Sequence, residues 1–559
     1  MLTCLRPAVI PAFLLFAMQL VLLVDDAKTP GVDAPLATVD KLYRAGKFPE
    51  AEAGYSALLK TDPKLEPAVV GLIHAMLGQQ KIDDALNTVN NALATAPNSA
   101  DLLAAKGDVQ FRRGEMPDSE KSYLAAQKLA RAQLGLARLY LSYSMYRRAF
   151  DVLQIAHQTA PDDLEIQMWW LAMLPRKERL AAMESLLASP HPDHEEEISF
   201  MTKYMEALKT RAGESAHPCR LVSKVDHTEM KLMAANPDRM GYEHGIGLST
   251  NINGHSLLLQ LDTGADGITV SRHQAQAIGL TRLSAAYISG IGDHGPQSGY
   301  RAIADHIQIG DLEFQDCVVL VADTPGSGQR LAPQNDGLIG TDVFGSYLVD
   351  LDLPEMRLKL SPLPKRPEDS IAPTSLNSDT EEMSNAEEGE DSASKQTSME
   401  NPSVPNPKAP QRLPRDRFIA PEMSTWTQAF RFRHLILIPT TVNESKPMLF
   451  LIDTGMDYNT LSARAGRQLS KVSEARGGFR GMSGQVDKVY TSAKIDLGFG
   501  RFEQKNNDII TFDFSNLNRQ VGTEISGALG YSTLRLLDVK LDYRDGLVDF
   551  EHNPKQGKR

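Results

Sequence analysis

The chain has 559 residues, 42% apolar and 23% charged, which predicts three or four domains of roughly 150 residues and excludes a collagen-like chain, a multispanning membrane protein and a wholly disordered chain. The net charge is −12, and the segment Pro367–Glu400 contributes most of it, because it holds ten acidic residues and one Lys. The rest of the chain is nearly balanced, so it offers no basic face and we expect no nucleic-acid partner.

The first 27 residues have the pattern of an export signal. Arg6 precedes an apolar run from Ala8 to Val24, and two acidic residues follow the run. At ~1.5 Å per residue the run spans about 26 Å, slightly less than a bilayer core, so an uncleaved membrane anchor is the alternative. Both interpretations predict an extracytoplasmic protein, periplasmic or secreted.

Residues 32–175 contain a repeat of about 34 residues. The landmarks of its successive copies are Ala51, Tyr55 and Pro63; Ala85, Val89 and Pro97; Ser119 and Tyr123; and Ala149, Leu153 and Pro161. Small residues let paired helices approach closely, aromatic residues fill the groove between repeats, and proline ends the second helix. The pattern resembles the tetratricopeptide repeat (TPR), which implies an α-solenoid whose groove binds a peptide or a partner protein; a plain spacer is the alternative. A helical cap, with helices over 164–174 and 178–187, is expected to extend to about residue 210.

The C-terminal half contains one motif twice. An apolar strand leads into Asp262-Thr263-Gly264 in the first copy and into Asp453-Thr454-Gly455 in the second. A glycine-containing hairpin follows 29 residues after each Asp, and an apolar pair with glycine follows at 77 or 78 residues. These later landmarks are Gly290, Ile291 and Gly292 with Leu338, Ile339 and Gly340 in the first copy, and Gly481 and Met482 with Leu529 and Gly530 in the second. Three landmarks in the same order at matched spacing, with a strand and turn between the last two at 306–310 and 494–498, indicate a duplicated domain.

The duplicated pattern resembles the retropepsin-like aspartic proteases. The resemblance implies two all-β acid-protease lobes, over residues 220–364 and 418–553, with Asp262 and Asp453 as the catalytic pair. It further implies that the Thr and Gly of each motif support the active-site loops, that the hairpins are flaps over the substrate, and that the apolar-apolar-Gly segments lie behind the catalytic loops. No metal ion or cofactor is needed for this chemistry.

Two carboxylates held close together share one proton and titrate as a pair, so that one accepts a proton from water while the other donates to the scissile carbonyl. Ala265 and Met456 follow the motifs and have no hydroxyl that could stabilise a charged carboxylate. We therefore predict an activity optimum near pH 5–6.

The segment 365–417 is rich in Ser, Pro, Glu and Asn and predicts a disordered acidic linker. About fifty residues reach about 40 Å, enough for one lobe to dock on the other. We therefore expect an intramolecular pseudo-dimer; homodimerisation of each copy between chains is the alternative.

The sequence as a whole predicts an α-solenoid followed by two retropepsin-like lobes, and an exported, bacterial aspartic endopeptidase whose repeats recruit a substrate or partner. The alternative is an inactive peptide-binding scaffold, which the bulky Met456 beside the second motif would favour. The three cysteines exclude a disulfide framework, although one Cys219–Cys317 bridge is compatible with an oxidising compartment.

Overall fold

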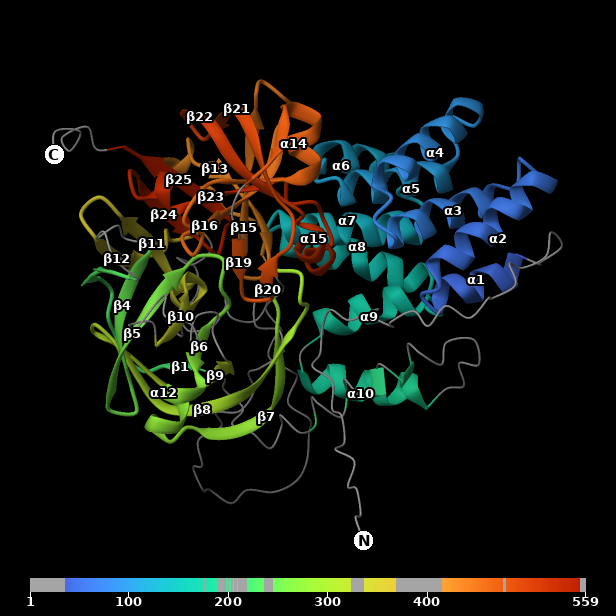
Figure 1. Cartoon of the computed structure of the whole chain (residues 1–559). Helices are drawn as coiled ribbons and strands as arrows, with labels where there is room; N and C mark the ends of the chain where they lie inside the picture. Colours follow the sequence, from blue (N-terminus) through green and yellow to red (C-terminus); the bar gives the residue numbers. More distant parts are fainter. Residues whose placement is uncertain are drawn as a thin grey trace, which may run out of the picture.

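The computed structural model describes residues 36–174, 176–188, 219–235, 245–322, 336–367, 415–475 and 479–552, together with a few positions between 198 and 209. A helical array is followed by two β-rich lobes, and we call residues 219–367 lobe 1 and residues 415–552 lobe 2 (Figure 1). The predicted fold class is confirmed. The export signal or anchor over 1–27 and most of the acidic linker lie outside the described residues. Within the described ranges, no helix has both the length and the apolar character that crossing a membrane requires.

The array is a succession of antiparallel helices. They are α1 (Leu36–Arg44), α2 (Phe48–Thr61), α3 (Glu66–Gly78), α4 (Ile82–Thr95), α5 (Ala100–Arg112), α6 (Met116–Ala125), α7 (Ala130–Ser142), α8 (Tyr146–Thr159), α9 (Leu164–Met173) and α10 (Arg176–Leu187). The aromatic ring of Tyr123 lies directly on two glycines, since a Cβ added at Gly107 or Gly135 would come within 2.5 Å of the ring. Ala85 and Ala149 are fully buried. The small and aromatic positions of the repeat therefore pack its helices as predicted.

Lobe 1 is a sheet that closes on itself. Its strands are β1 (Arg220–Leu221), β2 (Thr228–Lys231), β3 (Met233–Ala234), β4 (Ile246–Ile252), β5 (His255–Asp262), β6 (Ile268–Ser271), β7 (Thr281–Ile288), β8 (Gln297–Ile309), β9 (Leu312–Ala322), β10 (Gly337–Gly340), β11 (Tyr347–Asp352) and β12 (Arg357–Pro362), and its helices are α12 (Arg272–Ile278) and η1 (Thr341–Phe344). Strand β8 pairs with β4, β7 and β9, which closes the sheet around an apolar core. The structure joins Cys219 to Cys317 by a disulfide.

Lobe 2 repeats this plan. Its strands are β13 (Thr427–Gln428), β14 (Phe430–Phe432), β15 (Leu435–Val442), β16 (Met448–Asp453), β17 (Thr460–Ser462), β18 (Val472–Glu474), β19 (Phe479–Gly481), β20 (Gly484–Val486), β21 (Val489–Phe499), β22 (Phe502–Phe512), β23 (Gly527–Gly530), β24 (Asp538–Asp542) and β25 (Leu547–Glu551), and its helices are η3 (Pro421–Met423), α14 (Ala463–Leu469), α15 (Ser515–Val521) and α16 (Tyr531–Leu534). Strand β21 pairs with both β15 and β22, which closes the second sheet.

The two lobes share a third sheet. Among the described residues its order is β13-β25-β24-β11-β12-β2, so three strands come from each lobe. The lobes meet where β11 pairs antiparallel with β24, with Leu348 opposite Asp542 and Asp352 opposite Asp538. The buried apolar side chains of both lobes form one continuous cluster beside this sheet. Backbone hydrogen bonds and a common core therefore hold the two lobes of one chain together.

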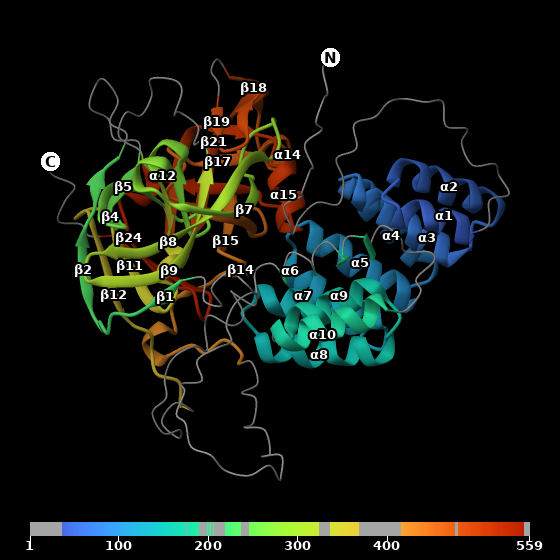
Figure 2. The same cartoon turned by 90° about the horizontal axis from the view of Figure 1, so that it is seen from below.

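The helical array packs on lobe 2 through the turns between its paired helices. Phe111, Met116 and Leu139 of the array are buried in the same apolar cluster as lobe 2 residues of β15 and β16. Helices α6 and α7 lie next to lobe 2 in both views of the molecule (Figures 1 and 2). The array and lobe 2 thus share a hydrophobic core rather than meeting only through a flexible tether.

Candidate active site

Each Asp of the duplicated motif ends a strand that has a parallel neighbour. In lobe 1, β5 lies beside β10, with Asp262 opposite Gly340. In lobe 2, β16 lies beside β23, with Asp453 opposite Gly530. The predicted apolar-apolar-Gly segments, Leu338–Gly340 and Leu529–Gly530, are therefore the strands next to the two catalytic-motif strands, in the same register in both lobes.

The two motif turns are tied to each other by their threonines. The backbone amide of Thr263 donates to Oγ1 of Thr454 at 3.1 Å, and the amide of Thr454 donates to Oγ1 of Thr263 at 3.0 Å. Each hydroxyl in turn donates to a carbonyl of the opposite lobe, that of Thr263 to Ile452 at 2.7 Å and that of Thr454 to Leu261 at 2.9 Å. Both threonines are buried. These four reciprocal bonds fix the distance between the turns that carry the two Asp residues.

The carboxyl groups of Asp262 and Asp453 hydrogen-bond each other. Burial raises the pKa of Asp262. Burial and the neighbouring carboxylate of Asp262 raise the pKa of Asp453 well above its ordinary value. Two adjacent buried carboxyls cannot both ionise at low cost, so the pair holds one proton over a wide pH range.

The motif glycines leave room for these carboxyls. A Cβ at Gly455 would lie 2.4 Å from the carboxyl carbon of Asp262, and a Cβ at Gly264 would lie 2.9 Å from Oδ2 of Asp453. The amides of the same glycines donate to the Asp of their own motif, Gly264 to Asp262 at 2.8 Å and Gly455 to Asp453 at 2.9 Å. Only glycine therefore allows the opposite carboxyl to approach so closely.

Met456 does not crowd the pair. Its side chain is 5% exposed and belongs to the apolar cluster of lobe 2, together with Leu451 and Ala528. Its backbone amide donates to Oδ1 of Asp453 at 3.1 Å. The large side chain of Met456 thus fills the core of lobe 2. Its size is therefore no argument that the second copy of the motif is inactive.

The two hairpins meet tip to tip. The amide of Ser483 donates to the carbonyl of Ile291 at 2.9 Å, and the amide of Gly290 donates to Oγ of Ser483 at 3.0 Å. The approach is close enough that a Cβ at Gly481 would lie 2.4 Å from the carbonyl oxygen of Ile291, and one at Gly290 would lie 2.8 Å from Cβ of Met482. All five predicted flap residues therefore lie at or next to this contact, and Ser483, which the motif comparison did not single out, forms its centre.

A second pair of acidic residues, Asp266 and Asp342, lies behind the lobe 1 motif and was not predicted. Both carboxylate oxygens of Asp342 accept from the amide of Gly267, at 3.1 and 3.2 Å. Burial and the negative charge of Asp266 raise the pKa of Asp342 to about 8. His434 of lobe 2 lies 3.8 Å from Asp266, and burial lowers the pKa of His434. Within the described residues no group of three or more His, Cys, Asp and Glu side chains is arranged to hold a metal ion.

Two protein-family models match parts of this chain, one in the helical array and one in lobe 1. No curated protein matches the chain. Among solved structures, a thermophilic TPR protein from Thermus thermophilus matches with 21% identity and a TM-score of 0.22, covering 24% of this chain and 77% of that one. The tetratricopeptide repeat family matches residues 42–109, and the aspartyl protease family matches residues 248–343. The chain therefore carries a tetratricopeptide repeat region followed by an aspartyl protease-like domain.

Proposed function

We propose that the protein is an aspartic endopeptidase in which Asp262 and Asp453 of one chain form the catalytic pair. The observation that supports this most directly is the reciprocal bonding of Thr263 and Thr454, which brings two equivalent strand ends together. Asp262 accepts a proton from the attacking water, and Asp453 carries the shared proton and donates it to the scissile carbonyl. The developing charge is then shared by two carboxyls that are shielded from solvent by the flaps.

We further propose an extracytoplasmic location and a recruiting role for the repeats. The location rests on the signal-like residues 1–27 and on the Cys219–Cys317 disulfide, because disulfides persist in oxidising compartments. The recruiting role rests on the array being fixed against lobe 2, so that a polypeptide held in its groove stays near the catalytic pair.

A statine-type transition-state mimic tests the proposed chemistry without a known substrate. Such a mimic is bound far more tightly by a working pair of carboxyls than by a site that lacks one. At a hundred times its Kd it stabilises the folded protein by about 2.7 kcal/mol, which raises the melting temperature by a few degrees. We expect this rise for the wild type and its loss for Asp262→Asn. Equal melting temperatures with and without the mimic across pH 4–6 would argue for the inactive scaffold.

We predict a pH profile of kcat/KM that peaks near pH 5–6. Hydrolysis requires one proton on the pair. Burial raises the pKa values of both Asp262 and Asp453, so the acidic and the basic limb of the profile both lie at higher pH than the titration of an exposed carboxyl. Activity falls at low pH because Asp262 becomes protonated, and it falls at high pH because Asp453 loses its proton. Initial rates from pH 3 to 8 on one peptide measure the profile, and a peak below about pH 3.5 would contradict it.

We also predict that most of the acidic linker can be removed without loss of activity. Both ends of the linker are held by the fully buried Asp545. Its Oδ1 lies 2.6 Å from the guanidinium of Arg366 at one end and accepts from the amide of Phe418 at the other end at 2.8 Å. The two ends therefore lie close together, and a few residues can join them at little cost in loop entropy. Replacement of residues 370–412 by about eight Gly and Ser residues should leave kcat/KM within twofold and the chain monomeric. A shift to dimers on shortening would indicate lobes exchanged between chains.

A further inference from the structure

One short segment of lobe 2 contacts the repeat array at one end and the lobe 1 flap at the other. It comprises residues 515–525, and we call it the latch segment. It begins with helix α15 and ends just before β23, the strand beside the catalytic strand of lobe 2. Oδ1 of Asn518 accepts from the amide of Ile525 at 2.9 Å, which ties the helix to the turn that follows it. The latch segment is therefore a single internally bonded unit.

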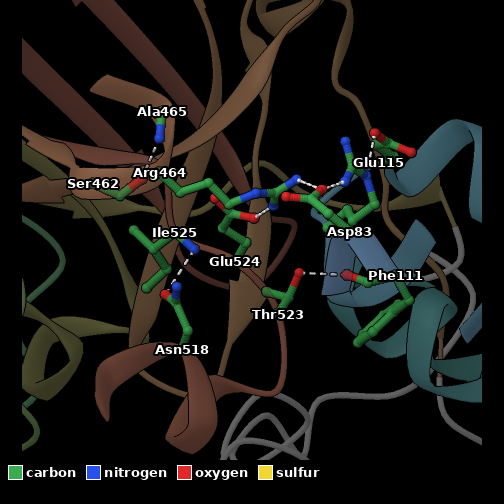
Figure 3. Close-up of polar contacts among 11 residues, drawn as sticks. Asp83, Phe111, Glu115, Ser462, Arg464, Ala465, Asn518, Thr523, Glu524 and Ile525 are labelled. Carbon is green, nitrogen blue, oxygen red and sulfur yellow. Dashed lines mark hydrogen bonds and ion pairs between the residues drawn. The ribbon is translucent and has the colours of Figure 1, made fainter. Parts of the chain in front are cut away.

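The repeat array holds the second half of the latch segment. Oγ1 of Thr523 donates to the carbonyl of Phe111 at 2.6 Å (Figure 3). The amide of Glu524 donates to the carbonyl of Arg112 at 2.9 Å. These carbonyls belong to the last turn of α5, where helical carbonyls need partners from outside the helix. Thr523 and Glu524 are 1% and 4% exposed, so water does not compete for either bond.

A chain of alternating charges strengthens the same contact. Arg464 of α14 pairs with Glu524 and also with Asp83 of α4, which lies 2.8 Å from it. Asp83 pairs in turn with Arg113 at the turn after α5 (Figure 3). Because Glu524 is buried, removing its partner would leave a buried charge without compensation, which is strongly destabilising. The position of the array is thus fixed relative to the latch segment.

The first half of the latch segment reaches the lobe 1 flap. Nδ2 of Asn516 donates to the carbonyl of Gly292 at 3.1 Å. Gly292 follows Ile291, whose carbonyl accepts from the lobe 2 flap, so Asn516 holds the flap at its point of contact with the other flap. The interlocked flaps must separate before a polypeptide can reach the carboxyl pair. Movement of the lobe 1 flap away from lobe 2 would break the bond between Asn516 and Gly292.

We infer that the repeat array controls the closure of the lobe 1 flap through the latch segment, with Asn516 as the positioning residue that holds the flap. The inference builds on the proposed function, because it concerns access to the same carboxyl pair. A polypeptide that shifts helix α5 when it binds the array would move Thr523 and, through α15, release or tighten Asn516. The repeats then act as a regulator of access as well as a recruiting surface.

Hydrogen exchange of the full-length chain tests this coupling without relying on hydrolysis. The amides of Gly290, Asp293, His294 and Ser483 are bonded only while the flaps are paired, so their exchange reports opening. Loss of one hydrogen bond typically changes such an equilibrium about fivefold. We expect about fivefold faster flap exchange in Asn516→Leu, and a similar increase in Thr523→Val, which alters the array contact on the opposite side of the segment. The double variant should exchange more slowly than the product of the two effects predicts.

Thr441→Val is the matched control, because the hydroxyl of Thr441 donates to the carbonyl of Gly498 elsewhere in lobe 2. It should leave the exchange of the flaps unchanged. Exchange of strands β24 and β25 serves as the internal reference for general loosening of the lobe. The inference is overturned if Thr523→Val leaves flap exchange at the wild-type rate, or if flaps and reference strands speed up equally. Because exchange is measured without substrate, this outcome is independent of whether the carboxyl pair hydrolyses peptides.

Discussion

Substituting Asn for either Asp262 or Asp453 should reduce peptide hydrolysis by roughly 10³-fold or more. The two carboxyls share one proton and act as a unit, so an amide at either position removes the acid or the base from the reaction. The loss in the double variant should be close to that in each single variant, because residues that act as a unit do not contribute additively. Hydrolysis of a mixed peptide library from pH 3 to 8 measures the effect.

The fold should survive these substitutions. Asp453 is 6% exposed, and Asn has the same shape but cannot ionise. The substitution removes the cost of holding two carboxyls side by side, so we expect the melting temperature of Asp453→Asn to equal or exceed that of the wild type. Asp305→Asn and Asp496→Asn are matched controls on the exposed faces of lobe 1 and lobe 2, and they should retain full activity.

Dependence on protein concentration separates the two ways of pairing the lobes. When both Asp residues belong to one chain, specific activity is constant on dilution. Activity that survives Asp453→Asn and rises with protein concentration would mean that lobe 1 works as a dimer between chains. A wild type that cleaves no peptide over the whole pH range would instead favour a binding scaffold.

The duplicated site was largely predictable because its chemistry is encoded locally. Asp-Thr-Gly at a strand end, followed at fixed distance by a hairpin and then by an apolar pair with glycine, is a pattern of neighbours along the chain. Each lobe forms these elements by itself, and the shared spacing of the two copies makes Gly340 and Gly530 equivalent. The repeat array was predictable for the same reason, since its period of about 34 residues is visible without knowing any long-range contact.

Contacts between the parts were not predictable from such patterns. Phe111 and Leu139 occupy apolar positions of the repeat, where a core role within the array explains them fully, yet both also enter the core of lobe 2. Asn516 and Thr523 carry no motif, and their importance arises only because folding brings α5 next to the latch segment. His434 likewise reaches the lobe 1 motif from the other lobe. Residues that join separately folded regions have no periodicity, so a single sequence gives no signal for them.

Because the array and lobe 2 share a core, a destabilising substitution on that face of the array should also destabilise lobe 2. Leu139 on α7 is fully buried among apolar residues of lobe 2 that include Leu437 and Leu449. Leu153 on α8 is equally buried, but its cluster consists of array residues alone. The two leucines therefore allow the same substitution, Leu→Ala, at equal burial with and without contact to lobe 2.

Both substitutions should destabilise the protein by about 2–5 kcal/mol, the usual cost of a cavity at a fully buried leucine. They should differ in which part of the molecule loses stability. In Leu139→Ala, hydrogen exchange should accelerate in β15 and β16, and kcat/KM should fall, because β16 ends at Asp453 and its packing against the array is weakened. In Leu153→Ala, exchange should accelerate only in α7 to α9, with kcat/KM unchanged below the melting transition. If lobe 2 keeps its wild-type protection in Leu139→Ala, the array is a separate domain that merely rests on lobe 2. If lobe 2 loosens, it requires the repeats for part of its own core, and the lobes alone should not fold stably.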